Sequence, residues 1–208
     1  MLISRTADKL KNIGADFVVF SGHKMVGPTG IGVLYARQEI QDEMAPSIFG
    51  GGMAHMVCVE QSTWARVPHS FEAGTPPIAQ AIGLAHAVLY LTQQVDFASL
   101  RMYEAQLIAQ AIDGLACFDR VRILGPVKQL KQNGHVVSFV VDGIHPHDVA
   151  AFLDQQEVAV AVRAGQQCAQ PLHAVLSIPA SIRVSVYLYT LSEDIELFIG
   201  YITKLLKK

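Results

Sequence analysis

The sequence is poor in features that define several common classes of protein. It has three cysteines and no Cys-x-x-Cys pair, which excludes a disulfide framework and a cysteine zinc site. Its 16 basic and 18 acidic side chains leave a net charge of -2, so it offers no broad positive surface for nucleic acid. The longest apolar run, from Ile78 to Leu91, is interrupted by Gln80 and His86, which is typical of a buried helix rather than a membrane span. The first residues lack an apolar leader with a small-residue cleavage site, so we expect a cytoplasmic protein.

The chain is nevertheless long and apolar enough to form a real core. Its 208 residues, 51% of them hydrophobic, allow one large domain or two small ones. A short apolar run from Phe17 to Phe20 and a second from Ile31 to Ala36 predict two strands joined in a hairpin, with a short helix after Ala36. The run of Gly50, Gly51 and Gly52 predicts a close approach of the backbone to another group.

Two helices and a compact α+β unit are expected to follow. Thr75 is placed as the N-cap and Pro76 as the first residue of a mostly buried helix that runs to about Gln94. A domain boundary is expected near Val95. Thr190 and Glu193 have the spacing of a capping box at the start of the last helix. The other predicted elements are a helix over 96–117, strands over 121–124, 136–141, 158–162 and 182–187, and helices over 146–155 and 192–206.

The lysine that follows the first strand is the most informative candidate for chemistry. Lys24 lies on a Gly-His loop, where partial burial would favour the neutral amine that attacks an aldehyde to form a Schiff base. An ordinary surface lysine is the alternative. Ser21 and Thr75 are small hydroxyls beside glycine, which suit either a phosphate or a turn or cap.

A second group of candidates lies near the end of the chain. Cys168 stands in a polar loop close to Arg163, a setting that favours a reactive thiol, although a lone cysteine is more often a small buried hydrophobe. Cys58 and Cys117 are interpreted as structural. Arg183 begins a strand and is either a surface charge or a side chain that binds a carboxylate through two N–H groups.

The spacing of two histidines argues against a metal site. His145 and His147 stand two residues apart at a helix start, so their rings do not share a helical face. A helix cap is the better interpretation, and no metal is expected.

Three strings, GADFVVFSGHKMVGPTGIGVLYA, FEAGTP and RAGQQCAQPL, together resemble the Suf and Csd type of cysteine desulfurase. These enzymes depend on pyridoxal 5'-phosphate and belong to the class V aminotransferase group. The resemblance implies an α/β fold, a truncated PLP-dependent transferase of fold type I. Residues 1–95 would be the C-terminal part of the PLP-binding large domain, and residues 96–208 the small α+β domain that carries the cysteine loop.

The resemblance also implies a role for each candidate residue. Lys24 would hold the cofactor covalently, with His23 and Ser21 beside it. Gly74 and Thr75 would bind the phosphate, Thr75 from the second subunit of a homodimer. Arg183 would bind the carboxylate of L-cysteine, and Arg163 would shape the loop of the acceptor thiol, Cys168.

The implied reaction converts L-cysteine to L-alanine and leaves a persulfide on Cys168. The sulfur would then pass to an acceptor protein for iron–sulfur cluster or related biosynthesis, and selenocysteine is a further possible substrate. In relatives, a long segment before the lysine strand supplies the groups that stack on the pyridine ring and pair with its nitrogen. Relatives also commonly have histidine where this chain has Gln166 and Gln167. A non-catalytic remnant, or an interaction module that retains the dimer surface, is therefore the alternative.

Overall fold

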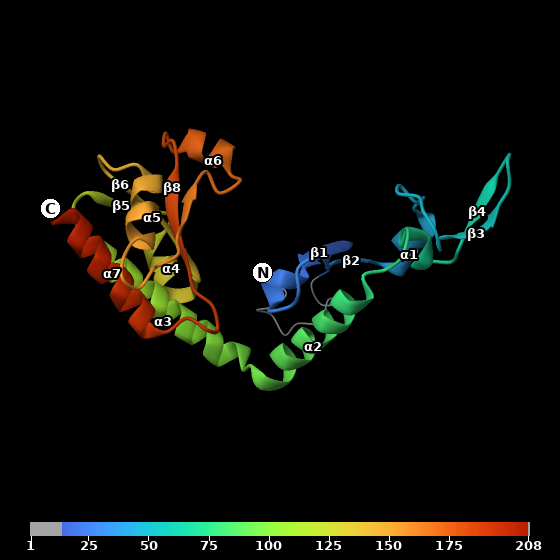
Figure 1. Cartoon of the computed structure of the whole chain (residues 1–208), viewed down its shortest axis with the longest axis horizontal. Helices are drawn as coiled ribbons and strands as arrows, with labels where there is room; N and C mark the ends of the chain where they lie inside the picture. Colours follow the sequence, from blue (N-terminus) through green and yellow to red (C-terminus); the bar gives the residue numbers. More distant parts are fainter. Residues whose placement is uncertain (1–13, 208) are drawn as a thin grey trace. The chain divides into compact units, whose positions relative to one another are not determined.

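The structure is a computed structural model that describes residues 14–207. Contacts divide the chain into two compact units, unit 1 (Met1–Phe97) and unit 2 (Ala98–Lys208). In the described part, each unit combines helices with antiparallel strands, which confirms the expected mixture of α and β structure (Figure 1). Between residues 14 and 207, no helix is both long and apolar enough to cross a bilayer.

Unit 1 opens with the predicted hairpin. Strand β1 (Phe17–Ser21) pairs antiparallel with β2 (Gly32–Ala36), in a register that places Ser21 opposite Gly32. The 3-10 turn η2 (Gly22–Met25) follows β1 directly. The other elements of unit 1 are α1 (Gln38–Glu43), β3 (Ala54–Val57), β4 (Ser62–Trp64), η3 (His69–Phe71) and α2 (Ile78–Gln94). Both predicted strands and the short helix after Ala36 are confirmed.

Helix α2 differs from its prediction at the N-terminus and in its burial. It begins at Ile78 with Pro77 in the N-cap position, so Thr75 is not the N-cap. The reason is local, because a residue that precedes proline is driven out of the helical region and Pro76 precedes Pro77. Ile82 is 57% exposed, which corrects the expectation of a mostly buried helix. Unit 1 covers one stripe of α2, formed by Leu84, Ala87 and Leu91.

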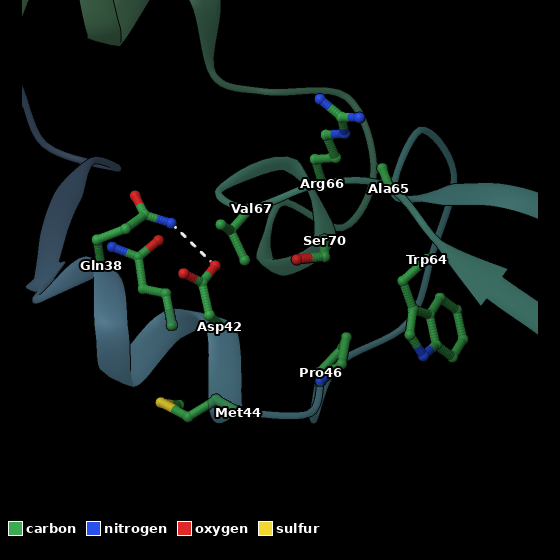
Figure 2. A pocket seen from close by; sticks show the side chains of 10 residues that line it. Gln38, Asp42, Met44, Pro46, Trp64, Ala65, Arg66, Val67 and Ser70 are labelled. Carbon is green, nitrogen blue, oxygen red and sulfur yellow. Dashed lines mark hydrogen bonds between the residues drawn. The ribbon is translucent and has the colours of Figure 1, made fainter.

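An open cavity of about 410 Å³ lies between α1 and the segment that follows β4 (Figure 2). Gln38 and Asp42 line it from α1, where the Gln38 amide donates to Asp42 Oδ1 at 3.0 Å. Trp64 and the buried Ser70 line it from the other side. None of the predicted site residues lines this cavity.

Unit 2 is built on a four-stranded antiparallel sheet with the order β5-β6-β8-β7. Alternate residues of β6 are buried, namely Val137, Phe139 and Val141, so this strand presents one face to the core. The strands are β5 (Val121–Leu124), β6 (Val136–Val141), β7 (Arg163–Gly165) and β8 (Ser181–Ser185). The helices are α3 (Phe97–Leu115), α4 (Val127–Asn133), α5 (Pro146–Asp154), α6 (Gln170–Val175) and α7 (Ser192–Leu206).

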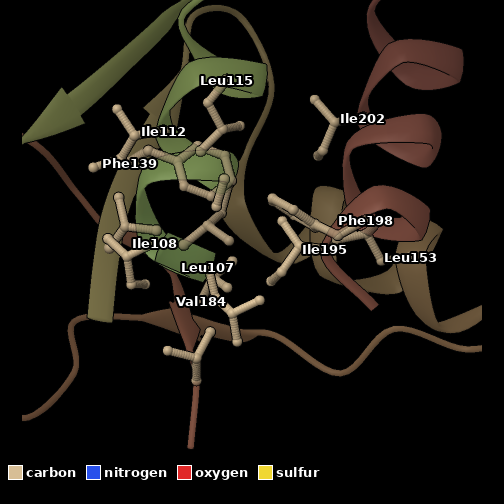
Figure 3. Close-up of a cluster of buried hydrophobic side chains, with 14 of the residues drawn as sticks. Leu107, Ile108, Ile112, Leu115, Phe139, Leu153, Val184, Ile195, Phe198 and Ile202 are labelled. Carbon is tan, nitrogen blue, oxygen red and sulfur yellow. The ribbon is translucent and has the colours of Figure 1, made fainter. Parts of the chain in front are cut away.

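The hydrophobic core of unit 2 joins this sheet face to three helices (Figure 3). Ile108 and Leu115 of α3, Leu153 of α5 and Ile202 of α7 are completely buried against it, and Phe139 meets Phe198 edge to face at 6.1 Å. Burial of each such side chain contributes about 1.5–3 kcal/mol. This core holds the strands that carry the second group of candidate residues.

Two predictions in unit 2 are wrong in detail. Residues 158–162 alternate as a strand would, yet the ladder with β8 covers only Arg163, Ala164 and Gly165, so the preceding residues have no strand to pair with. At the start of α7, Asp194 rather than Glu193 accepts from the cap backbone, with the Leu191 N–H donating at 2.9 Å. The Thr190 hydroxyl instead accepts from Tyr187 N–H at 3.1 Å.

The two histidines and the two remaining cysteines have different outcomes. His145 caps α5, where its Nδ1 accepts from the His147 N–H at 3.3 Å, which confirms the capping interpretation. Cys58 and Cys117, interpreted as structural, are both exposed free thiols. Cys117 follows the end of α3 and its thiol donates to the Asp113 carbonyl at 3.3 Å.

Candidate functional site

The turn that carries the candidate lysine is fixed by its backbone. Gly22 N–H donates to Ile31 O at 2.9 Å and Gly27 N–H donates to Gly22 O at 3.1 Å, so both ends of the turn are closed. A Cβ on Gly22 would lie 2.9 Å from Ile31 Cγ2 and 3.1 Å from Pro28 O. Only glycine fits at this position, which therefore fixes where the next two side chains leave the backbone.

The Lys24 side chain is exposed, which corrects the expectation that it is partly desolvated. The turn has about three residues in each helical turn, and Met25 is the side chain that it buries, at 6% exposure. His23 and Lys24 consequently project outward, while Ser21 is half-buried at the end of β1. Within the described part of unit 1, Lys24 is open to solvent.

A second segment of unit 1 brings two glycine-containing loops together. Gly74 has a φ of +86° and its N–H donates to Gly51 O at 2.8 Å. A Cβ on Gly50 would lie only 3.2 Å from Gly74 N, which confirms the predicted close approach of the backbone in this glycine run. Thr75 is exposed next to this contact. Because Thr75 does not cap α2, its hydroxyl is not committed to the helix end.

In unit 2, two residues of the cysteine loop have a backbone conformation that residues other than glycine rarely adopt. Gln167 and Cys168 have φ values of 56° and 58°, both in the left-handed region. Cys168 is exposed, and Arg163 Nη2 lies 3.7 Å from its sulfur. The loop therefore holds a thiol beside a guanidinium.

Gln167 has a structural part in this loop that the sequence did not reveal. Its Nε2 lies within hydrogen-bond distance of three carbonyls, at 3.0 Å from Arg163 O, 3.3 Å from Ser181 O and 3.4 Å from Gly165 O. In the sequence, Gln167 is notable only because relatives commonly have histidine there. The structure shows that it braces the turn before Cys168.

The two candidate arginines lie directly opposite each other. Arg163 of β7 pairs with Arg183 of β8, and residues paired in this way have side chains on the same face of the sheet. Arg183 is half-buried, and its Nε has no hydrogen-bond partner among the described residues. Two like charges side by side are unfavourable unless an anion joins them, so this face suits a carboxylate.

The candidates thus fall into three local groups. The first group is Ser21 at the end of β1 with His23 and Lys24 on the turn that follows it, and the second is Gly74 with Thr75. The third group, in unit 2, is Arg163 on β7, Arg183 on β8 and Cys168 on the loop after β7. Sequence reasoning missed two buried residues behind the cysteine loop, His173 and Ser181, at 4% and 1% exposure. No pattern in the sequence distinguishes that histidine from a surface one. Among residues 14–207, no group of three or more His, Cys, Asp or Glu side chains is arranged to hold a metal ion.

Comparison with known proteins gives consistent matches along the chain. The family model for aminotransferase class-V matches residues 3–198. A cysteine desulfurase of Haloferax volcanii is 46% identical over 187 residues, which make up 90% of this chain and 43% of that protein. An apo cysteine desulfurase from Thermococcus onnurineus has a TM-score of 0.90 at 39% identity, covering 99% of this chain and 50% of the other.

A second solved structure has almost the same similarity. Escherichia coli cysteine desulfurase CsdA, in an S-sulfonic acid form, has a TM-score of 0.89 at 32% identity. The match covers 98% of this chain and 49% of the other. The chain therefore spans about half the length of the relatives that it matches.

Proposed function

Because this chain belongs to the class V aminotransferase family, we propose that it is part of a pyridoxal-phosphate-dependent cysteine desulfurase. One observation supports the proposal most strongly: the exposed thiol of Cys168 lies 3.7 Å from the Arg163 guanidinium, and Arg183 is on the paired strand. A thiol on the loop after β7 and an arginine on the neighbouring strand β8 suit the two ends of a small sulfur-containing amino acid.

The residues of unit 1 fit the cofactor. Lys24 presents an accessible amine on a turn that only glycine at position 22 permits, and an amine in that setting can bond an aldehyde. Thr75 offers an exposed hydroxyl, a group that binds a phosphate, and Gly74, whose N–H is bonded to Gly51 O, holds the segment beside it. Ser21 and His23 would support the cofactor from the same turn as Lys24. When bound, the pyridine ring supplies an electron sink for breaking the carbon–sulfur bond.

The chain's own groups then have separate tasks. Arg183 grips the substrate carboxylate through its free Nε and orients the amino acid. Lys24 moves the proton that leaves and returns at the substrate carbon atoms. Cys168 receives the sulfur, so that L-cysteine and the protein thiol become L-alanine and a protein persulfide with no other oxidant or reductant. Arg163 stabilises the negative charge on the attacking sulfur.

The wider biological role is also part of the proposal. A persulfide on an exposed thiol is accessible to an acceptor protein, which would use the sulfur for iron–sulfur cluster or related assembly. We place Thr75 in the site of a second subunit, so the working form is a homodimer. The three cysteines are free thiols, which suits the reducing cytoplasm.

A non-catalytic interaction module is the second candidate function, because exposed side chains favour it. Lys24 is exposed, and several large apolar side chains of unit 1 are exposed as well. These include Val19 at 73%, Leu34 at 63% and Ile82 at 57%. Such a surface suits association with another chain.

Persulfide formation at Cys168 separates the two candidates. The chain is incubated with pyridoxal 5'-phosphate and L-cysteine, and peptide mass spectrometry then locates any persulfide. The desulfurase predicts persulfide on Cys168 together with free alanine, and the loss of both in Cys168→Ser but not in Cys117→Ser. Persulfide spread equally over the three exposed cysteines, or absent from all of them, would support the interaction module.

A further inference from the structure

A buried histidine lies directly behind the cysteine loop. His173, in α6, is 4% exposed, and both of its ring nitrogens have partners. Its Nδ1 lies 2.9 Å from Ala169 O and its Nε2 lies 3.0 Å from Ser181 Oγ. Because a carbonyl oxygen can only accept, Nδ1 carries the proton of the neutral ring and Nε2 accepts from the Ser181 hydroxyl. The imidazole therefore ties the residue after Cys168 to strand β8.

Ser181 is the common anchor of the loop on its other side as well. Its carbonyl accepts from Gln167 Nε2 at 3.3 Å, and Ser181 pairs with Gly165 across β7 and β8. The residues before and after Cys168 are thus both held to one buried residue, the first through the side chain of Gln167 and the second through His173. Between these two attachments the backbone adopts two successive left-handed residues.

These observations indicate that neighbouring residues restrain the backbone at Cys168. Left-handed backbone is unfavourable for residues other than glycine, and it persists only where the surroundings hold it in place. If the tie through His173 were removed, the loop could return to ordinary backbone and carry the sulfur away from Arg163. Neither His173 nor Ser181 needs to touch a substrate for this effect.

The geometry points to His173 as a positioning residue that, through Ser181, holds the Cys168 sulfur against the Arg163 guanidinium. The inference rests on the proposed function for what the thiol receives. Its test needs only the chain and small thiol reagents, so it can fail or succeed independently of the cofactor and of sulfur transfer.

Charge-selective labelling of Cys168 measures the contact with Arg163. Methanethiosulfonates transfer an alkylthio group to a thiolate and release methanesulfinate, and they exist in anionic and cationic forms of similar size. A guanidinium beside the sulfur favours the anionic reagent, so the ratio of the anionic to the cationic rate should be roughly three- to tenfold higher at Cys168 than at Cys58 at low salt. Peptide mass spectrometry resolves the two cysteines within the same protein.

We expect Arg163→Ala to remove most of this excess at Cys168, with the remainder coming from Arg183 on the paired strand. His173→Ala should reduce the ratio to the Arg163→Ala value, and Ser181→Ala should reduce it in the same direction. His173→Gln, whose amide can reach the Ser181 hydroxyl, should retain most of the excess. Ile112→Ala serves as the matched control, because it removes a buried side chain of α3 away from the loop and should leave the ratio unchanged.

The outcomes decide the inference in each case. An unchanged ratio in both His173→Ala and Ser181→Ala, with Arg163→Ala lowering it, would show that His173 does not position the thiol. No excess at Cys168 in the unsubstituted chain would also overturn the inference, because the contact with Arg163 would then be missing in solution. If circular dichroism shows that His173→Ala does not fold, the milder Ser181→Ala decides.

Discussion

At the scale of single residues, the cysteine loop combines unfavourable backbone with compensating side-chain contacts. Each left-handed residue other than glycine costs about 1 to 2 kcal/mol, and Gln167 and Cys168 are both of this kind. Hydrogen bonds that contribute about 1 kcal/mol each offset part of this cost, and the Gln167 amide faces three carbonyls. The loop is therefore held in place by its neighbours rather than by its own preference.

Two substitutions at Gln167 separate these effects. Gln167→Ala and Gln167→Gly both lose the amide contacts, but only alanine keeps the cost of the left-handed backbone. We expect Gln167→Ala to lower the free energy of unfolding of unit 2 by more than Gln167→Gly does, by about 1 kcal/mol. Urea unfolding followed by circular dichroism measures the difference. Equal losses in the two variants would contradict the backbone explanation.

At the scale of elements, the contact between two glycine loops holds in place the segment of Gly74 and Thr75, which is predicted to bind the phosphate. Gly50→Ala would place a Cβ 3.2 Å from Gly74 N, whereas a Cβ on Gly51 has open space around it. We expect Gly50→Ala to speed the amide exchange of Gly74 by roughly tenfold, because its bond to Gly51 O is disturbed. Gly51→Ala is the matched control and should leave the rate near that of the unsubstituted chain. Equal rates in the two variants would remove the packing argument.

Helices α3 and α7 pack closely against each other where Gly114 of α3 meets Ile199 of α7. A Cβ on Gly114 would lie 2.6–2.8 Å from three side-chain atoms of Ile199. Alanine gains about 1 kcal/mol of helix propensity over glycine, but overpacking costs about 1–3 kcal/mol, and contacts this short make the clash the larger effect. Gly114→Ala should therefore lower the melting temperature of unit 2.

A double variant tests whether Ile199 is the cause. In the Ile199→Ala background, Gly114→Ala should no longer destabilise the protein, because the clashing atoms are gone. Thermal unfolding of the four proteins in this cycle gives the coupling energy. Additive effects would show that Gly114 is restricted by something other than Ile199.

Sequence patterns predicted the helices and strands that are determined by residues within the segment itself. The apolar run at Phe17 and the helix that contains Ile108 and Ile112 were recognised because their periods match strand and helix. Residues 158–162 carry an equally clear alternation, yet whether they form a strand depends on a partner about twenty residues further along the chain. That pairing is a long-range property that no local pattern contains.

The candidate site shows the same division. Lys24 and Cys168 are predicted as site residues from the residues around them, and both lie on exposed turns in the structure. The partial burial predicted for Lys24 was wrong, because burial depends on segments far away in the chain. His173 and Ser181 were missed for a similar reason, since their contact joins a short helix to a strand across a turn.

At the scale of the whole molecule, the stabilising core is concentrated in one unit. The described cluster of buried apolar side chains runs from Leu107 to Ile202 and lies entirely within unit 2. A segment with its own core and a closed set of sheet pairings is expected to fold alone. Residues 96–208 expressed by themselves should therefore unfold cooperatively in urea, with a midpoint close to that of the corresponding transition in the full chain. A gradual, non-cooperative loss of ellipticity would contradict this expectation.

The central claim is that Lys24 is the residue that binds pyridoxal phosphate, and covalent trapping tests it most directly. The full chain is mixed with the cofactor, reduced with borohydride and digested, and mass spectrometry locates the stable adduct. We predict that the adduct lies on Lys24, that Lys24→Ala loses it together with the visible absorption band, and that Lys128→Ala, which alters an exposed lysine of unit 2, keeps both. An adduct distributed over the surface lysines, with Lys24 labelled no more than Lys128, would contradict the account.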